Sequence, residues 1–189
     1  MTYNEVIGKM KGYTSTFQYF EYYKNTPKKG SYTCFDKVVK TYRYEDKMPE
    51  LKWKITSETK TIAHHKCQKA TTEWGGRTWT AWFTTAIPIS NGPWLLSGLP
   101  GLILEAQDAE NIFHFIAIEL RKLPEGTSVR PPHLKHIPCT RNEFVKLRDE
   151  YNNNPQGGLG KAMGRKLTIM GADGKPLKAK QHQKNYFEK

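Results

Sequence analysis

The sequence predicts a mainly β (α+β) protein, built as a curved antiparallel sheet or a partly open barrel with one short helix near residues 141–152. Aromatic and β-branched residues gather in short runs over the first two-thirds of the chain, as they do in strands. Pro, Gly and Asn separate these runs, and apolar residues at helical spacing follow Thr140. The 189 residues suit one domain. We expect a single β-rich domain over residues 1–155, with its most informative part at 53–118, and a basic C-terminal extension at 156–189.

The first two aromatic runs predict a β-hairpin. Residues 14–24 and 31–44 are rich in aromatic and β-branched side chains, and residues 25–30 between them carry turn chemistry. Further on, Leu51, Trp53 and Ile55 alternate with polar residues, which predicts a strand with one buried face.

A β-meander is predicted next. Residues 57–62 lead into a strand through residues 66–70, and paired glycines make a tight turn at Glu73–Gly76 because glycine accepts positive φ cheaply. In the following strand, residues 77–84, alternation places Trp79, Ala81 and Phe83 on one face.

Residues 86–101 differ from both strands and ordinary loops. They contain three prolines and three glycines, too many for regular structure, together with Trp94, Leu95, Leu96 and Leu99. Ordinary loops are polar, so this segment is expected to pack into the fold as an ordered crossover.

Two further strands and a helix complete the predicted fold. Strands are expected at residues 102–108 and 112–123, and the second is apolar on both faces, which predicts a central strand covered on both sides. Thr140 and Glu143 form a capping box, and the helix that follows is expected to end at Asn152–Pro155. Its apolar stripe is Phe144, Leu147 and Tyr151, and a minor hairpin is expected later, around residues 171–174.

The charge is concentrated towards the end of the chain. The net charge is +12, and residues 156–189 hold eight basic and two acidic side chains, a formal charge of +6. This segment is either a solvated tail or a surface for nucleic acid or lipid headgroups. The sequence contains no run of about 20 apolar residues of the kind that crosses a membrane.

No catalytic motif and no cofactor-binding motif is recognised. The Gly98–Gly101 glycines lack phosphate-loop spacing, and neither a nucleophile elbow nor a zinc-protease helix occurs. The three cysteines are widely separated, which favours reduced, buried thiols. Two groupings nevertheless contain metal-ligand residue types, although neither supplies the four ligands of a closed zinc site; the weak candidates are His65, Cys67, His133, His136 and Cys139.

The tryptophans beside turns have two interpretations. Trp74, Trp82 and Trp94 lie next to glycines, threonines and a proline rather than inside apolar runs. They can form an amphipathic binding surface, or they can cover the ends of a sheet.

An ordered string of motifs over residues 53–118 resembles the GLPGLI (Porph_ging) family of Bacteroidetes. The family's naming hexapeptide occurs without mismatch at residues 98–103, and 67–71, 76–84 and 87–94 also fit. The resemblance implies an exported protein of unestablished function, made with a signal peptide and encoded near TonB-dependent receptor-like outer-membrane proteins. No signal is recognised here, so we expect the natural start, with any lipid anchor, to lie upstream of Met1. The motif positions outside the hexapeptide are Cys67, Arg77, Trp79, Pro88, Gly92, Pro93 and Trp94.

The function expected from these observations is non-catalytic. The chain is expected to bind a protein, a peptide or an apolar ligand in the periplasm or at the outer membrane, in a cleft bordered by residues 86–101, although the same motif can simply maintain the fold. The alternatives are a metal-binding protein or metal-dependent enzyme, and nucleic-acid binding through residues 156–189. The candidate binding residues are Arg77, Trp79, Trp82, Pro88, Gly92, Pro93, Trp94, Gly98, Leu99, Pro100 and Gly101.

Overall fold

The computed structural model describes residues 7–10, 20–127 and 135–154, together with 129, 131, 157, 158, 160 and 164, and for 7–10 it describes the backbone alone. The chain divides into two compact units. The first contains β1 and the strands between residues 48 and 130, and the second contains the strands of residues 18–47 with the helix after residue 131. The expected single domain over 1–155 stays a prediction, and most of the basic extension lies outside the described residues.

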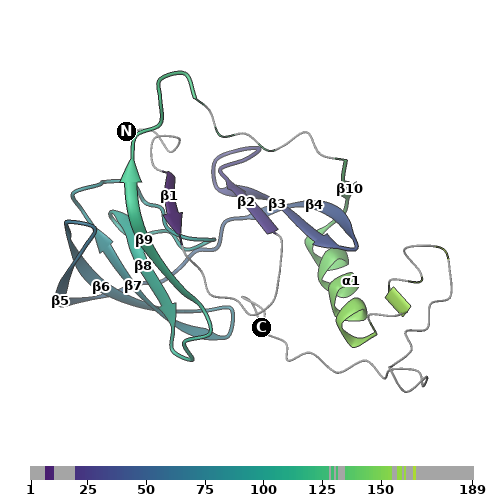
Figure 1. Ribbon diagram of the computed structural model, residues 1–189. Coiled ribbons are helices and arrows are strands. Elements are labelled where there is room, and N and C mark those ends of the chain that lie inside the picture. The colour runs from purple at the N-terminus through teal and green to yellow at the C-terminus, as the bar shows by residue number, and fades with distance from the viewer. Residues whose placement is uncertain are drawn as a thin grey trace, which may run out of the picture. The chain divides into compact units, whose positions relative to one another are not determined.

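The first unit is a six-stranded sheet with the order β1-β9-β8-β7-β6-β5 (Figure 1). Each described pair of neighbours is antiparallel, and β1 and β5 are the edge strands, so the sheet does not close into a barrel. The predicted mainly β class with an open antiparallel sheet is confirmed. The strands are β1 (Ile7–Met10), β5 (Lys54–Ile62), β6 (His65–Trp74), β7 (Arg77–Thr84), β8 (Leu102–Asp108) and β9 (His114–Arg121).

Two tight turns connect β5, β6 and β7. Gly75 and Gly76 have φ of 60° and 68°, as a type I′ hairpin turn requires, so the turn predicted there is confirmed. The turn between β5 and β6 uses the same left-handed region at Ala63 and His64, with φ of 46° and 65°. Residues other than glycine are strained in this conformation, so the residue types at these two positions do not indicate a turn in the sequence.

The strand predicted from the alternation of Leu51, Trp53 and Ile55 is wrong in its start and in its buried face. The strand β5 begins at Lys54, and Ile55 is 45% exposed. Trp53 lies before the strand, where its indole Nε1 donates to the carbonyl oxygen of Ser97 at 2.8 Å. The apolar residues here anchor the chain to the segment after β7.

The strand that is buried on both sides is β8, not the one predicted at residues 112–123. Six of the seven residues of β8 are buried, as expected for a strand in the middle of the sheet. In β9, Ala117 is buried whereas Ile116 and Ile118 are 36% and 59% exposed. Both apolar faces of β9 were predicted to be covered, and that prediction is wrong because one of them faces solvent.

The second unit holds a four-stranded sheet with the order β10-β4-β3-β2, in which β10 is parallel to β4. The hairpin predicted around residues 25–30 is confirmed as β2 and β3, but residues 31–44 are not one strand. They fold back at Val39, which has φ of 62° although a β-branched residue is strained there. The strands are β2 (Phe20–Lys24), β3 (Ser31–Val38), β4 (Lys40–Lys47) and β10 (Ile137–Pro138).

The helix α1 (Arg141–Asn153) begins and ends as predicted. The Thr140 hydroxyl accepts from the Glu143 amide, the Glu143 carboxylate accepts from the Thr140 amide, and Asn154 is the C-cap. The buried Phe144 stacks on Tyr44 of β4 with ring centroids 5.4 Å apart, which fastens the helix to its own unit's sheet.

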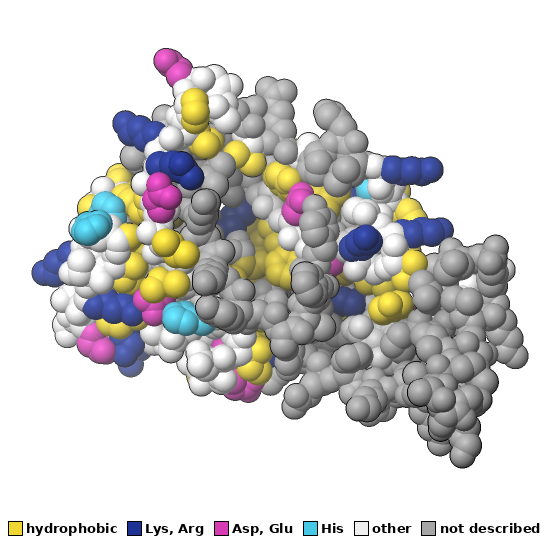
Figure 2. Space-filling model, in the orientation of Figure 1, with side chains coloured by type: hydrophobic (Ala, Val, Ile, Leu, Met, Phe, Trp, Pro, Cys, Tyr) yellow, Lys and Arg dark blue, Asp and Glu magenta, His cyan; other side chains and the backbone are white. Residues whose placement is uncertain are grey.

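The described surface carries charge of both signs. Figure 2 shows Lys and Arg side chains scattered over the viewed face, with Asp and Glu between them. The hairpin predicted around residues 171–174 lies outside the described residues.

No helix within the described part of the chain has the length and apolar composition needed to cross a membrane.

Candidate binding site on the concave face of the six-stranded sheet

Residues 86–101 wrap around the start of β8. The Leu102 amide donates to the Ile87 carbonyl oxygen at 3.0 Å, and the Ile103 amide donates to the Asn91 carbonyl oxygen at 2.9 Å. The leucines of the segment, Leu95, Leu96 and Leu99, are 1%, 0% and 2% exposed. The prediction that this apolar segment packs inward as an ordered crossover is confirmed.

The glycines of the segment permit close backbone approaches. A Cβ at Gly101 would lie 2.1 Å from the Thr84 carbonyl oxygen, and a Cβ at Gly92 would lie 2.7 Å from Cβ of Ile103. Gly98 has φ of +97° and lies beside the Trp53 indole. These contacts explain the glycines by packing; their role in binding stays a prediction.

A buried ion pair fixes the end of the sheet where β7 begins. Nη1 of Arg77 lies 2.6 Å from Oδ2 of Asp108 and 3.0 Å from Oε2 of Glu110, and the guanidinium lies over the Phe113 ring. Oδ1 of Asp108 accepts from the Phe113 amide at 2.8 Å. The sequence pattern identified Arg77 but not its partner Asp108, because the two residues lie on different strands.

Three tryptophans meet near this ion pair. The Trp94 ring centroid lies 4.4 Å from that of Trp74 and 6.0 Å from that of Trp79. Trp79 is fully buried, whereas Trp74 and Trp94 are half-buried. Trp82 is separate, because alternation along β7 turns it to the other face of the sheet.

The face that carries Trp82 can be followed across four strands. Residues directly opposite each other in neighbouring strands share a face, as do residues two apart in one strand. Lys60 pairs with Cys67 between β5 and β6, Lys69 pairs with Trp82 between β6 and β7, and Trp82 pairs with Glu105 between β7 and β8. Lys60, Cys67, Trp82 and Glu105 therefore lie on one face.

This face is concave. Ile62 of β5 and Leu104 of β8 belong to one cluster of buried side chains, although β6 and β7 lie between their strands. Across the same two strands, Nζ of Lys60 lies 2.7 Å from Oε2 of Glu105. The sheet therefore curls, and we call this surface the concave face.

The centre of the concave face holds a charged cluster, Lys60, Trp82, Glu105 and His114. The Glu105 side chain is only 9% exposed, and its second oxygen lies 3.2 Å from Nε2 of His114. Nζ of Lys60 lies 4.5 Å from the Trp82 ring centroid, within cation–π range. The Lys60 and His114 side chains are 36% and 41% exposed, so both reach solvent from a nearly buried carboxylate.

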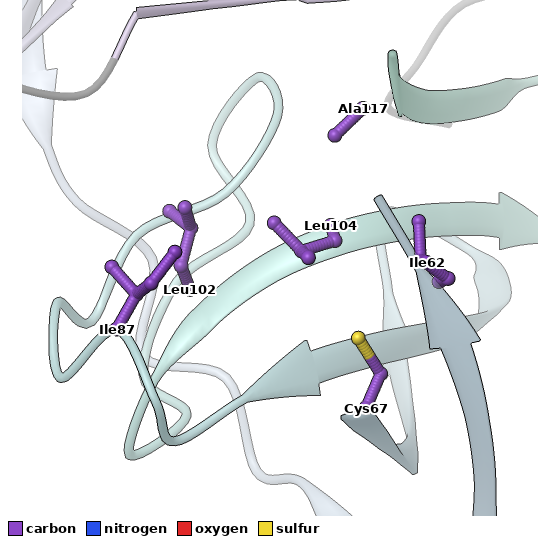
Figure 3. Close-up of a cluster of buried hydrophobic side chains, with 6 residues drawn as sticks. All are labelled: Ile62, Cys67, Ile87, Leu102, Leu104 and Ala117. Atoms are coloured by element: carbon purple, nitrogen blue, oxygen red, sulfur yellow. The ribbon is translucent and has the colours of Figure 1, made fainter. Parts of the chain in front are cut away.

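An apolar floor adjoins the charged cluster, because Trp82 packs against it. Figure 3 shows the buried side chains of this floor. It brings together side chains from four strands and from the segment after β7, and Trp82 and Ile89 pack against it. The concave face is thus bordered by the start of residues 86–101, where Ile87 and Ile89 lie. The buried members of the floor are Ile62, Cys67, Ile87, Leu102, Leu104 and Ala117.

The metal candidates are not assembled into a site in the described part of the chain, where no three His, Cys, Asp or Glu side chains gather as ligands. His65 and Cys67 lie on β6 in the first unit, His136 and Cys139 lie in the second, and His133 lies outside the described residues. Burial raises the pKa of the Cys67 and Cys139 thiols, and that of Cys34 to about 12, which disfavours the thiolate that metals and electrophiles need.

The predicted binding residues divide into three groups. Most of them build the segment and the buried end of the sheet, and among these Arg77, Trp79, Pro93, Leu99 and Gly101 are buried. Pro88, Gly98 and Pro100 are exposed, and Gly92 and Trp94 are half-buried. Of all the predicted residues, Trp82 is the one that the pairing places in the charged cluster.

Sequence reasoning missed Lys60, Glu105 and His114. The signal that was available is a glutamate inside the otherwise apolar run Leu102–Ala106, since a buried carboxylate needs partners.

Two solved structures of PNGF-II share this fold. The structure in the C2 space group aligns with a TM-score of 0.53 and 18% identity over 70% of this chain and 25% of that one. The structure in the P21 space group aligns with a TM-score of 0.55 and 15% identity over 75% of this chain and 28% of that one. The chain therefore spans about a quarter of the length of these relatives, and the likeness is one of fold.

No curated protein matches the chain. Residues 75–105, which include Arg77, the tryptophan-rich strand and the leucine segment, match the family model described as "Protein of unknown function (Porph_ging)". The resemblance to the GLPGLI (Porph_ging) family that the motif string indicates is thus confirmed over this segment.

Proposed function

We propose that this chain is a non-catalytic, exported protein of the cell envelope that binds a ligand or partner on the concave face of its six-stranded sheet. One observation carries the proposal: Glu105, Lys60 and His114 form a charged cluster at the centre of that face, beside an apolar floor. The interior of a small curled sheet is ordinarily filled by side chains that pack together. A few convergent polar groups against apolar walls are instead the composition of a ligand site.

The absence of a reactive arrangement in this cluster favours binding over catalysis. Both oxygens of Glu105 are held by cationic or hydrogen-bonding partners, and the nearby Cys67 is buried with a raised pKa. A nucleophile needs a base within hydrogen-bond reach and a path to substrate. Cys67 donates instead to the carbonyl oxygen of His65.

The proposed cellular location of the protein rests on the family resemblance. That resemblance implies export to the periplasm or the outer membrane, with a TonB-dependent receptor-like system as the setting in which the protein is accessory. The experiment is therefore designed for the envelope of the organism that encodes the chain.

Site-directed photo-crosslinking in intact cells tests the proposal. A benzophenone amino acid at position 114 would sit on the concave face, where the native side chain is 41% exposed. The matched control replaces Lys66, which is exposed on the other face of β6. We expect a discrete adduct from position 114 and none from position 66. Equal labelling from both positions, or no adduct from position 114, would contradict the proposal.

A further inference from the structure

We propose that the ligand of the concave face is an amphipathic carboxylate, an organic acid with one negative charge and an apolar chain. This inference rests on the proposed function and names the chemical class that the charged cluster selects.

The cluster offers donors rather than acceptors. Glu105 has Lys60 at one oxygen and His114 at the other, and its side chain is only 9% exposed, so it presents little acceptor surface to a cationic ligand. A lysine ammonium has three donors, and the Lys60 side chain is 36% exposed beside Glu105. His114 presents its ring to solvent from the other side, with 41% of the side chain exposed. The ligand group that complements the Lys60 ammonium is an acceptor.

The charge of the cluster favours an acceptor with a single negative charge. Lys60 and Glu105 neutralise each other, so the cluster has little net charge with which to balance a highly charged ligand. A doubly charged phosphate would leave a negative charge uncompensated in a half-buried place, which is costly. The chain as a whole has a net charge of +12, which attracts anions towards it.

The apolar part of the ligand has neighbours on both sides of the carboxylate. Ile116 pairs directly with Glu105 across β8 and β9 and is 36% exposed. Trp82 lies on the opposite side, half-buried, and packs against the apolar floor. An apolar chain lying along these two side chains would remove exposed hydrocarbon from water, at about 25 cal/mol for each Å².

Titration of the full-length, ¹⁵N-labelled protein with octanoate tests the inference through its indole N–H signals. We expect the Trp82 signal to move saturably, while that of Trp53, whose N–H is bound to the Ser97 carbonyl oxygen, stays in place. Three control ligands separate the contributions of the head group and the chain. Acetate lacks the apolar chain, 1-octanol lacks the negative charge, and octyl phosphate has a different, more highly charged head group. We expect each of the three to bind at least tenfold more weakly than octanoate.

Two lysine variants separate the site from general charge. Lys60→Gln is expected to weaken octanoate binding about tenfold or more, whereas Lys66→Gln, which removes an exposed lysine from the other face of β6, leaves it unchanged. His114→Gln is the second site variant and is expected to weaken octanoate binding while retaining the folded spectrum. Equal losses in Lys60→Gln and Lys66→Gln would overturn the inference.

The remaining outcomes distinguish the inference from the function on which it rests. The inference that the ligand is a carboxylate would be overturned if 1-octanol bound as tightly as octanoate or if octyl phosphate bound more tightly. It would also be overturned if octanoate gave no saturable shift at millimolar concentration. A protein adduct from position 114 together with no octanoate binding would leave the proposed function standing and remove the inference. Absence of both would remove both.

Discussion

Gly101 lies against the backbone of Thr84, so closely that a Cβ there would be 2.1 Å from the Thr84 carbonyl oxygen. The contact joins the end of residues 86–101 to the end of β7, and the obstacle is backbone rather than a movable side chain. Gly101→Ala is therefore expected to destabilise the protein by about 2–3 kcal/mol, the upper part of the range of about 1–3 kcal/mol for overpacking, because backbone cannot move aside. Urea unfolding measures the loss.

Gly126→Ala is the matched control for this substitution. Nothing lies within 4 Å of a Cβ at Gly126, so only its positive φ of +79° costs stability, about 1 kcal/mol. Equal losses at the two positions would show that the close approach at Gly101 is absent.

Removing one partner of the buried ion pair between Arg77 and Asp108 is predicted to destabilise the protein strongly. The two side chains are 2% and 0% exposed, so Asp108→Ala removes the buried carboxylate from a buried guanidinium and is expected to cost about 3–5 kcal/mol. Glu110→Ala removes a carboxylate that is 53% exposed and is expected to cost about 0–1 kcal/mol. Thermal unfolding compares the two, and a larger loss in the Glu110 variant contradicts the buried pair.

Glu105 is predicted to stabilise the curled sheet as well as to form the charged cluster. Glu105→Gln keeps the volume of the side chain but removes the charge that Lys60 and His114 contact, and it is expected to cost about 1–3 kcal/mol. Glu58→Gln is the control, because Glu58 pairs with Lys69 while 57% exposed and should contribute about 0–1 kcal/mol. Indistinguishable free energies of unfolding for the two variants would argue against a buried cluster.

Asp36 is expected to make the second unit less stable as the pH rises. Burial raises the pKa of this carboxyl from 3.8 to about 6, although the Lys37 amide opposes the shift. Because the folded state holds the proton more tightly, the contribution of Asp36 is fully present below pH 3.8 and is lost as the pH rises through about 6.

Asp36→Asn should therefore gain stability relative to the native protein between pH 4 and pH 7, by at most about 3 kcal/mol. Chemical unfolding at the two pH values measures the difference. Asp46→Asn, at a position where the side chain is 43% exposed, controls for general charge effects. A gain that is the same at both pH values contradicts the raised pKa.

Local patterns predicted the regular parts of the fold. The alternation in β7 and the paired glycines before it defined a strand and its turn, because both signals act within a few residues. The capping box of Thr140 and Glu143 fixed the start of α1 in the same way. The turn at Val39 was missed because a β-branched residue occupies a conformation that it rarely adopts.

The candidate site could not be predicted in the same way, because it depends on the curl of the sheet. Register shifts between Trp82 and Phe83, and between Ile55 and Thr59, mark irregularities that bend strands and increase their twist. Such bulges are not visible in a hydrophobic pattern. The resulting curl contributes to placing Lys60 of β5 beside Glu105 of β8, although β6 and β7 lie between these two strands.

The proximity of the methyl groups of Ile62 and Leu104 in solution would test the curled sheet most directly. Both side chains belong to the apolar floor, although β6 and β7 lie between their strands. A nuclear Overhauser effect between their methyl protons, observed in the methyl-labelled full-length protein, is the result that we predict. Its absence, with the two groups separated by about three strand spacings as in a flat sheet, would contradict the concave face and the binding site built on it.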